Sequence, residues 1–173
     1  MTGLQLFEAT IADAKPVVKL ANEAYRGNDG WTSEYGLISG TRLCEEMVGE
    51  MLENENQKLL LFKEGEGLSA CIHLERDGDS VHFGCFCVDP KQQGTGIGKY
   101  VLKQAEDWAR SNWSTRKVFM EVVSVRKELI DYYLRRGFMN TGKNEMYPYH
   151  DERFGIPTRE NLTFDILEKH IIK

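Results

Sequence analysis

The strongest sign of chemistry in this sequence is a glycine-rich turn near the middle of the chain. It lies between an apolar run typical of a strand and a pattern typical of a helix, and reads Gln93-Gly94-Thr95-Gly96-Ile97-Gly98. Because glycine has no Cβ atom, such a turn lets backbone N–H groups converge on an anion at a helix N-terminus, where the helix dipole also favours negative charge. The turn therefore predicts a site for a phosphate or a diphosphate.

Two nucleotide-binding motifs do not fit this turn. A dinucleotide fingerprint needs a further glycine at position 99 or 101, where Lys99 and Val101 stand. A nucleoside-triphosphate loop needs glycine at position 93 and Ser or Thr at position 100, where Gln93 and Tyr100 stand.

The turn fits the pattern Gln/Arg-x-x-Gly-x-Gly/Ala, and a second motif follows at residues 128–138, where Tyr133 precedes Gly137-Phe138. With both motifs, most of the chain resembles the GNAT superfamily of acyl-CoA-dependent N-acetyltransferases, whose second motif is Ala-x-x-Phe-Tyr-x-x-x-Gly-Phe. Two departures stand out: Leu129 or Ile130 replaces the alanine, and an asparagine often found after the fifth strand is missing, since that place holds Ser124, Val125 and Arg126.

This resemblance implies a transferase that uses acetyl-CoA as co-substrate, needs no metal and passes the acetyl group directly to a primary amine. It also implies that amides of the turn bind the coenzyme A pyrophosphate, while pantetheine lies between the diverging fourth and fifth strands, where a free amide would stabilise the oxyanion. The expected coenzyme contacts are Phe86, Cys87, Val88, Gln93, Gly94, Thr95, Gly96, Ile97, Gly98 and Lys99.

Tyr133 is the candidate general acid, because a tyrosine can pass its proton to a departing thiolate. It shares the apolar stripe of its helix with Leu129, Ile130 and Leu134. A core tyrosine with a satisfied hydroxyl is therefore the alternative interpretation.

Glu121 and His82 are the candidate bases. Glu121 interrupts the apolar run 118–123, where burial is expected to raise its pKa and where a carboxylate is costly unless paired or used. By the resemblance, a branch of the family that acts on protein N-termini has a fifth-strand glutamate as base, and other branches have an acid or base on the fourth strand, near His82. The alternatives are a structural partner for Arg126 or a hydroxyl in the case of Glu121, and an ordinary sheet histidine in the case of His82.

An expected hairpin at Asp77-Gly78 sets the faces of the neighbouring strands. With these residues as the turn, Arg76 pairs with Asp79, and His73 lies opposite His82. In that register Cys85 points to the face opposite Cys71 and His73, which argues against a zinc site. No metal is expected, and small core residues with reduced thiols are the simplest interpretation of Cys44, Cys71, Cys85 and Cys87.

Length and charge limit the class of protein. A chain of 173 residues with 41% apolar residues fits a single N-acetyltransferase domain over residues 1–173. The net charge of −5 has the wrong sign for a nucleic-acid or anionic-membrane binder, so neither partner is expected. With no export signal and no apolar run long enough to span a membrane, we expect a cytoplasmic location.

The elements that must position these residues form an α+β order. Helices are expected after Thr10, over residues 42–52 and 97–112, and around the apolar stripe 129–134, where Gly137 ends the helix. Strands are expected over residues 5–9, 58–63, 67–75, 80–88, 118–123, 139–143 and 162–167. The strand-helix-strand unit around the turn requires one parallel pairing. The resemblance implies a mostly antiparallel GNAT-type sheet with helices on both faces and a splayed parallel pair at the acyl-CoA site.

Two loops, residues 27–40 and 145–161, are expected to border the site of a small-molecule or peptide amine. The acidic net charge favours a cationic acceptor. The second loop could equally pack on itself or on a second subunit as a homodimer. A coenzyme A-binding sensor or scaffold without turnover, and an interaction protein that shares only the fold, are the alternative functions.

Overall fold

A seven-stranded sheet forms the centre of the structure, a computed structural model that describes residues 3–171. Its strands are β1 (Gln5–Glu8), β3 (Gln57–Glu64), β4 (Gly67–Asp77), β5 (Ser80–Val88), β6 (Lys117–Val123), β7 (Met139–Met146) and β9 (Thr163–His170), in the order β1-β3-β4-β5-β6-β9-β7. All neighbouring strands are antiparallel except β5 and β6, which are parallel. The predicted α+β fold class is confirmed.

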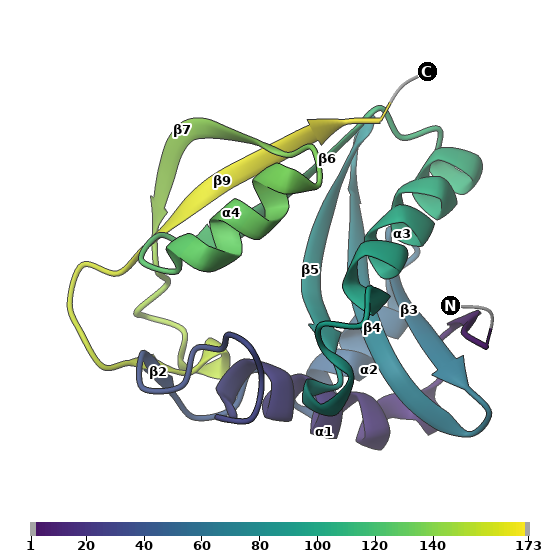
Figure 1. The fold of residues 1–173 in the computed structure, drawn as a ribbon, viewed down its shortest axis with the longest axis horizontal. Helices are drawn as coiled ribbons and strands as arrows, with labels where there is room; N and C mark the ends of the chain where they lie inside the picture. Colours follow the sequence, from purple (N-terminus) through teal and green to yellow (C-terminus); the bar gives the residue numbers. More distant parts are fainter. Residues whose placement is uncertain (1–2, 172–173) are drawn as a thin grey trace.

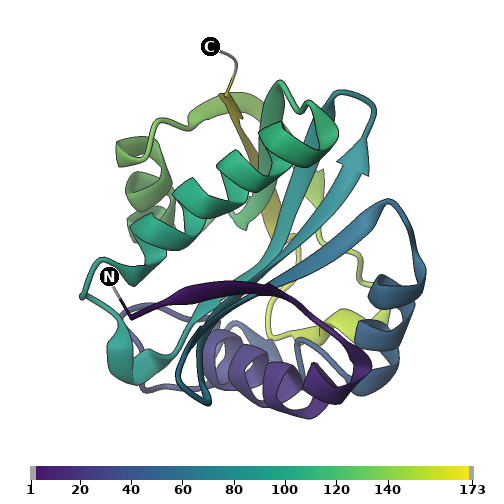
Figure 2. The ribbon, with the colours of Figure 1, turned by 90° about the vertical axis from the view of Figure 1, so that its right-hand side faces the viewer.

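The helices cover both faces of this sheet (Figure 2). One face carries α1 (Ala14–Arg26) and α2 (Glu45–Glu53), and the other carries α3 (Ile97–Trp113) and α4 (Lys127–Arg135). Each pair buries an apolar stripe against the strands: Val17 and Met47 lie in the first core cluster, and Val101 and Ile130 lie in the second. The sheet thus separates two cores, and a residue's face decides which of them it meets.

The parallel pair β5 and β6 separates soon after it begins. Pairing runs only from Ser80 opposite Lys117 to His82 opposite Phe119. Beyond His82 the two halves of the sheet diverge, as Figure 1 shows between β5 and the β6–β9 pair. Residues 83–88 and 120–123 therefore do not pair with each other, which confirms the splayed parallel pair.

A β-bulge turns the end of β5. Cys71 pairs with Cys87 but His73 pairs with Gly84, so two residues of β5 stand opposite Ile72 alone. Cys85 takes a φ of 47°, the left-handed conformation that a bulge can impose on one residue. As a result Cys85 packs with Cys71 and Cys87 on the α1–α2 side, and the prediction that it faces away from Cys71 is wrong.

The expected register of the β4–β5 hairpin is also wrong. The turn residues are Gly78 and Asp79, so Asp77 pairs with Ser80, and His73 lies opposite Gly84 instead of His82. The slip moves His73's partner by two positions, and because side chains alternate with a period of two, His73 and His82 still share one face.

Two short strands that the sequence does not predict pair with each other, one from each of the two long loops. Strand β2 (Ile38–Ser39) pairs with β8 (Ile156–Pro157), and between β7 and β8 runs a one-turn 3-10 helix, η3 (Glu152–Phe154). Helix α2 also begins later than expected, because the side chain of Asn22 accepts the N–H groups of Arg42 and Leu43. The two loops thus pack against each other.

The single domain over residues 1–173 stays a prediction, and residues 1–2 and 172–173 lie outside the described part of the chain. Among the described residues, no helix has the length and apolarity that crossing a membrane requires. The cytoplasmic location and the homodimer also stay predictions.

Candidate functional site

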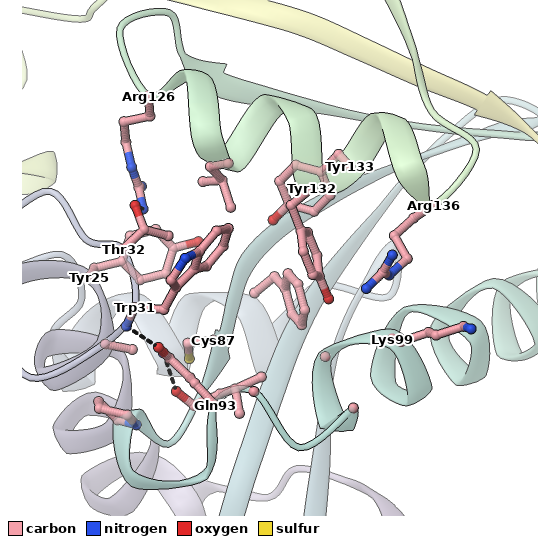
Figure 3. Close-up of a pocket in the computed structure, with 18 of the residues that line it drawn as sticks. Tyr25, Trp31, Thr32, Cys87, Gln93, Lys99, Arg126, Tyr132, Tyr133 and Arg136 are labelled. Atoms are coloured by element: carbon pink, nitrogen blue, oxygen red, sulfur yellow. Dashed lines mark hydrogen bonds between the residues drawn. The ribbon is translucent and has the colours of Figure 1, made fainter.

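A cavity of about 620 Å³ lies where β5 and β6 separate, and residues from both sides of the sheet line it. It is bounded by the end of α1 and the loop after it, by the end of β5, by the glycine turn and by α4 (Figure 3). Of the expected site residues, those that line it are Phe86, Cys87, Val88, Gln93, Gly94, Gly96, Gly98, Lys99 and Tyr133. The structure therefore gathers most of the predicted coenzyme contacts around one space.

The glycine turn leaves the start of α3 without a side-chain cap. Gly94 and Gly96 have φ values of 81° and 85°, a left-handed conformation that other residues rarely adopt, and Gly96 is the residue before the helix. The first-turn N–H groups of an α-helix have no partner within the helix. Because no side chain accepts them here, they are available to an anion at this end of the cavity.

Two residues of the turn have other roles. The hydroxyl of Thr95 donates to the carbonyl of Gln92 at 2.5 Å, and Ile97 packs into the core between the sheet and α3. Neither side chain lines the cavity. Any contribution of these two residues to ligand binding would come from their backbone.

Gln93 connects the turn to the loop after α1. Its amide donates to the carbonyl of Val88 at 3.2 Å, and its carbonyl oxygen accepts the N–H of Trp31 at 2.6 Å (Figure 3). A Cβ atom at Gly30 would lie only 2.8 Å from that oxygen, so the loop approaches Gln93 where it has a glycine. Gln93 therefore fixes the loop that carries Trp31 beside the cavity.

Tyr133 lies inside the cavity among aromatic rings. Its ring centroid is 5.4 Å from that of Tyr132, 5.8 Å from Phe138 and 6.3 Å from Phe86. Burial raises the pKa of Tyr133 above its ordinary value of 10.0, against the opposing effect of the Arg126 guanidinium. The phenol is therefore protonated at neutral pH and has a proton to donate.

His82 and Glu121 are hydrogen-bonded to each other, through Nε2 and Oε2, where β5 and β6 begin to separate. Both lie on the α1–α2 side of the strands, and neither lines the cavity that contains Tyr133. Their side chains are 25% and 29% exposed, so water can reach them. Two residues that the sequence presents as rival bases therefore form one pair.

The expectation of a raised pKa for Glu121 is wrong. Burial does raise the pKa of this carboxyl, but the hydrogen bond with His82 and the charges of His82 and Arg42 lower it by more, so it lies below the ordinary value of 4.5. Glu121 is consequently ionised at neutral pH and holds the imidazole of His82 in place.

A buried ionic network lies behind the end of the cavity that is far from the glycine turn. Glu34 accepts Arg26 Nε at 3.0 Å and lies 3.6 Å from Arg126 Nη1, and all three side chains are more than nine-tenths buried. Arg26 also donates to the carbonyl of Phe154 at 2.9 Å, which ties in the second loop. Arg126 donates to the hydroxyl of Thr32 at 3.3 Å.

Sequence reasoning missed the role of this network, and also Tyr25, which lines the cavity, and Arg42, whose guanidinium lies 5.2 Å from the Tyr25 ring centroid. The sequence does predict that the two loops border the acceptor site, but the ion pair of Glu34 with Arg126 joins residues far apart in the chain, so no local spacing shows it. We call this region, with Trp31, Thr32 and Arg126, the arginine end of the cavity. The glycine end consists of residues 93–99 and Arg136, which lies at that side in Figure 3.

The cysteines of β4 and β5 pack together without forming a recognisable metal site. The sulfur atoms of Cys71 and Cys87 are 3.1 Å apart, and Cys71 also contacts the carbonyl of Cys85 at 3.7 Å. Within residues 3–171, no group of three or more His, Cys, Asp or Glu side chains is placed to hold a metal ion.

Comparison with solved structures finds the same fold in N-acetyltransferases. The ribosomal-protein-S18-alanine N-acetyltransferase from Escherichia coli aligns with a TM-score of 0.75 at 15% identity, over 98% of this chain and 95% of that one. A spermidine N-acetyltransferase from Vibrio cholerae in complex with CoA and spermine aligns with a TM-score of 0.70 at 16% identity, over 98% of this chain and 96% of that one. At these identities the likeness concerns the fold.

A comparison with curated protein sequences gives no significant match. The family model described as "Acetyltransferase (GNAT) family" matches residues 19–138, which is more than half of the chain. The matched range includes the glycine turn and the tyrosine motif, both of which contribute residues to the lining of the cavity. The chain therefore belongs to the GNAT acetyltransferase family, as its two motifs predict.

Proposed function

We propose that this protein transfers an acetyl group from acetyl-CoA directly to a primary amine, with Tyr133 as general acid. The observation that carries the proposal is that one cavity contains both the uncapped start of α3 and the buried phenol of Tyr133. A CoA-bound structural neighbour supports coenzyme A as the ligand class. The turn amides, Lys99 and Arg136 at the glycine end would hold the phosphates of the donor.

Acetyl-CoA supplies a thioester whose acetyl carbon forms the new C–N bond while the C–S bond breaks. The unpaired edge of β5 near residues 86–88 offers backbone groups to the donor arm and to the oxyanion. The His82–Glu121 pair, directly or through water, takes the proton that the amine loses, and Tyr133 gives its proton to the leaving thiolate. In this proposal the acid and the base lie on opposite sides of the strands, at the point where β5 and β6 separate.

A thiol-release assay with acetyl-CoA and a panel of amines tests this proposal. Tyr133→Phe should lower kcat by about 100-fold or more, since general acid catalysis contributes that much, while acetyl-CoA binding by thermal shift is retained. Tyr35→Phe, which makes the same chemical change on a 61% exposed side chain, is the matched control and should leave kcat unchanged. Unchanged turnover in Tyr133→Phe would remove the assignment of the acid.

The base pair is tested in the same assay. Because His82 and Glu121 act as a unit, His82→Gln and Glu121→Gln should each lower kcat, and the double variant should be little worse than the poorer single variant. If both single variants keep full turnover, another base is required. Acetyl-CoA binding without turnover on any amine would support the coenzyme A sensor instead.

A further inference from the structure

The charges that line the cavity all have one sign. The charged lining residues are Lys99, Arg126, Arg135 and Arg136, and no Asp or Glu is among the described residues that line it. This local charge is opposite to the net charge of −5 of the whole chain. The expectation of a cationic acceptor, which rests on net charge alone, therefore does not describe the surface that an acceptor would meet.

Arg126 lies apart from the other three cations that line the cavity. Lys99 and Arg136 lie at the glycine end, next to the start of α3, and Arg135 precedes Arg136 in the chain. Arg126 lies at the opposite end, where its side chain extends from the start of α4 toward Thr32 (Figure 3). The phosphates of a donor bound at the glycine end do not account for a cation at the other end.

Arg126 is buried, and its guanidinium is only partly satisfied. Its side chain is 8% exposed, its Nε atom has no partner among the described residues, and its contacts to Glu34 and Thr32 are long, at 3.6 and 3.3 Å. Glu34 is held more closely by Arg26, at 3.0 Å. Arg26 Nη1 and Arg136 Nε are likewise buried without a partner within residues 3–171, but Arg126 is the one of the three that lines the cavity away from the glycine end. A buried guanidinium N–H without an acceptor is costly unless a further acceptor binds it.

The carboxylates nearest to Arg126 are already engaged. Glu34 lies between two guanidinium groups, and exposed Glu128 accepts the hydroxyl of Thr32 at 2.6 Å. Glu34 is therefore not free to hold an ammonium group, and Glu128 is not among the residues that line the cavity. The arginine end thus presents a cation without a lining carboxylate among the described residues, beside Tyr25, Trp31 and Leu129, and such a surface favours an anion on the acceptor.

Arg126 and Tyr133 have a spacing that suits one small molecule. Arg126 is the residue before α4 and Tyr133 follows it by seven residues, so at about 1.5 Å per residue their Cα atoms are separated by about 10 Å along the axis. Both side chains line the cavity between them. A ligand whose amine lies near Tyr133 can therefore place a second group against Arg126.

We infer that the acceptor is an amine that carries a carboxylate in the same small molecule, an amino acid in the broad sense, and that Arg126 binds this carboxylate. The planar N–H edge of a guanidinium matches a carboxylate with two parallel hydrogen bonds. This inference rests on the proposed acetyl transfer, because it names the acceptor of that reaction.

The test compares α- and ω-amino acids of increasing chain length with their primary amides in the thiol-release assay. For at least one chain length, kcat/KM should be tenfold or more higher for the acid than for the amide. Arg126→Gln should bring that ratio close to one while the KM for acetyl-CoA stays within about twofold, and Arg126→Lys should keep part of the ratio. The matched control Lys127→Gln removes an exposed charge from the same helix turn and should keep the full ratio.

Calorimetric titration of the best amino acid into the protein saturated with coenzyme A separates this inference from the proposed function. Binding to the parent but not to Arg126→Gln, without turnover on any amine, would support the carboxylate site and overturn the transfer. Equal turnover of acid and amide, or a preference for spermidine or for a phosphate-bearing amine, would overturn the carboxylate assignment and leave the transfer standing. Absence of both binding and turnover would overturn both.

Discussion

At the glycine end of the cavity, the groups offered to a ligand are mainly backbone amides from one run of the chain, residues 93–98. At the arginine end, they are side chains from α1, from the loop after it and from the start of α4. The first end needs left-handed glycines and an uncapped helix. The second needs three buried charges held in register by two loops. The contrast suggests that the glycine end binds the same donor whatever the nearby side chains are. At the arginine end, by contrast, a few substitutions can change which acceptor binds.

Glu34→Gln tests whether the buried carboxylate of Glu34 stabilises the arginine end. The change removes the carboxylate between Arg26 and Arg126 and leaves two buried guanidinium groups without a counter-charge. Breaking a buried ion pair in this way costs about 3 kcal/mol, which for a domain of this size lowers Tm by about 6–12 °C. Thermal unfolding checks this, and the KM for the amine should rise while the KM for acetyl-CoA does not.

Glu23→Gln is the matched control for that variant. Glu23 pairs with Lys19 on the outside of the same helix, with side chains 51% and 74% exposed, and a surface pair of this kind contributes little. Its Tm should not change measurably. A Glu34→Gln variant as stable as the parent would show that the arginine end is held by its backbone, and the contrast with the glycine end would be lost.

Gly96→Ala tests the opposite end with a smaller effect. At a φ of 85° an alanine is strained by about 1–2 kcal/mol, and rotating the turn to relieve that strain misaligns the amides at the start of α3. We expect the KM for acetyl-CoA to rise about tenfold, the equivalent of about 1.4 kcal/mol, with little change in the KM for the amine.

Gly142→Ala is its matched control, because Gly142 has a φ of 80° and, like Gly96, has no atom within 4 Å of an added Cβ, but lies in β7. It should lose similar stability and keep its KM for acetyl-CoA. Equal KM values in the two variants would mean that the geometry of the turn does not hold the donor.

The same contrast explains how much the sequence predicts. The glycine turn and Tyr133 follow from local patterns, because a backbone turn and a helix stripe depend on neighbours in the chain. The arginine end depends on contacts such as Arg126 with Thr32, which are 94 residues apart, and on two loops with no periodic pattern. The sequence does not show the bulge at Cys85 either. One additional residue in a strand reverses which face the following side chains occupy, without changing the composition of the strand.

The smallest predicted effect concerns a buried base that belongs to neither end. Burial, aided by the charges of His82 and Arg42, lowers the pKa of His73 from its ordinary 6.5 to about 3, so between these values the folded protein binds fewer protons here than the unfolded chain. Stability should therefore be fully present above about pH 6.5 and fall by about 1 kcal/mol on going to pH 5.5. Denaturant unfolding at both pH values should show this loss in the parent and in His170→Gln, an exposed control, but not in His73→Gln.

The same variant separates unfolding from catalysis in a pH profile. If kcat/KM falls with acid equally in the parent and in His73→Gln, the fall comes from the reaction and can be assigned to the two ends of the cavity and the His82–Glu121 pair. If it disappears in His73→Gln, it only reports unfolding.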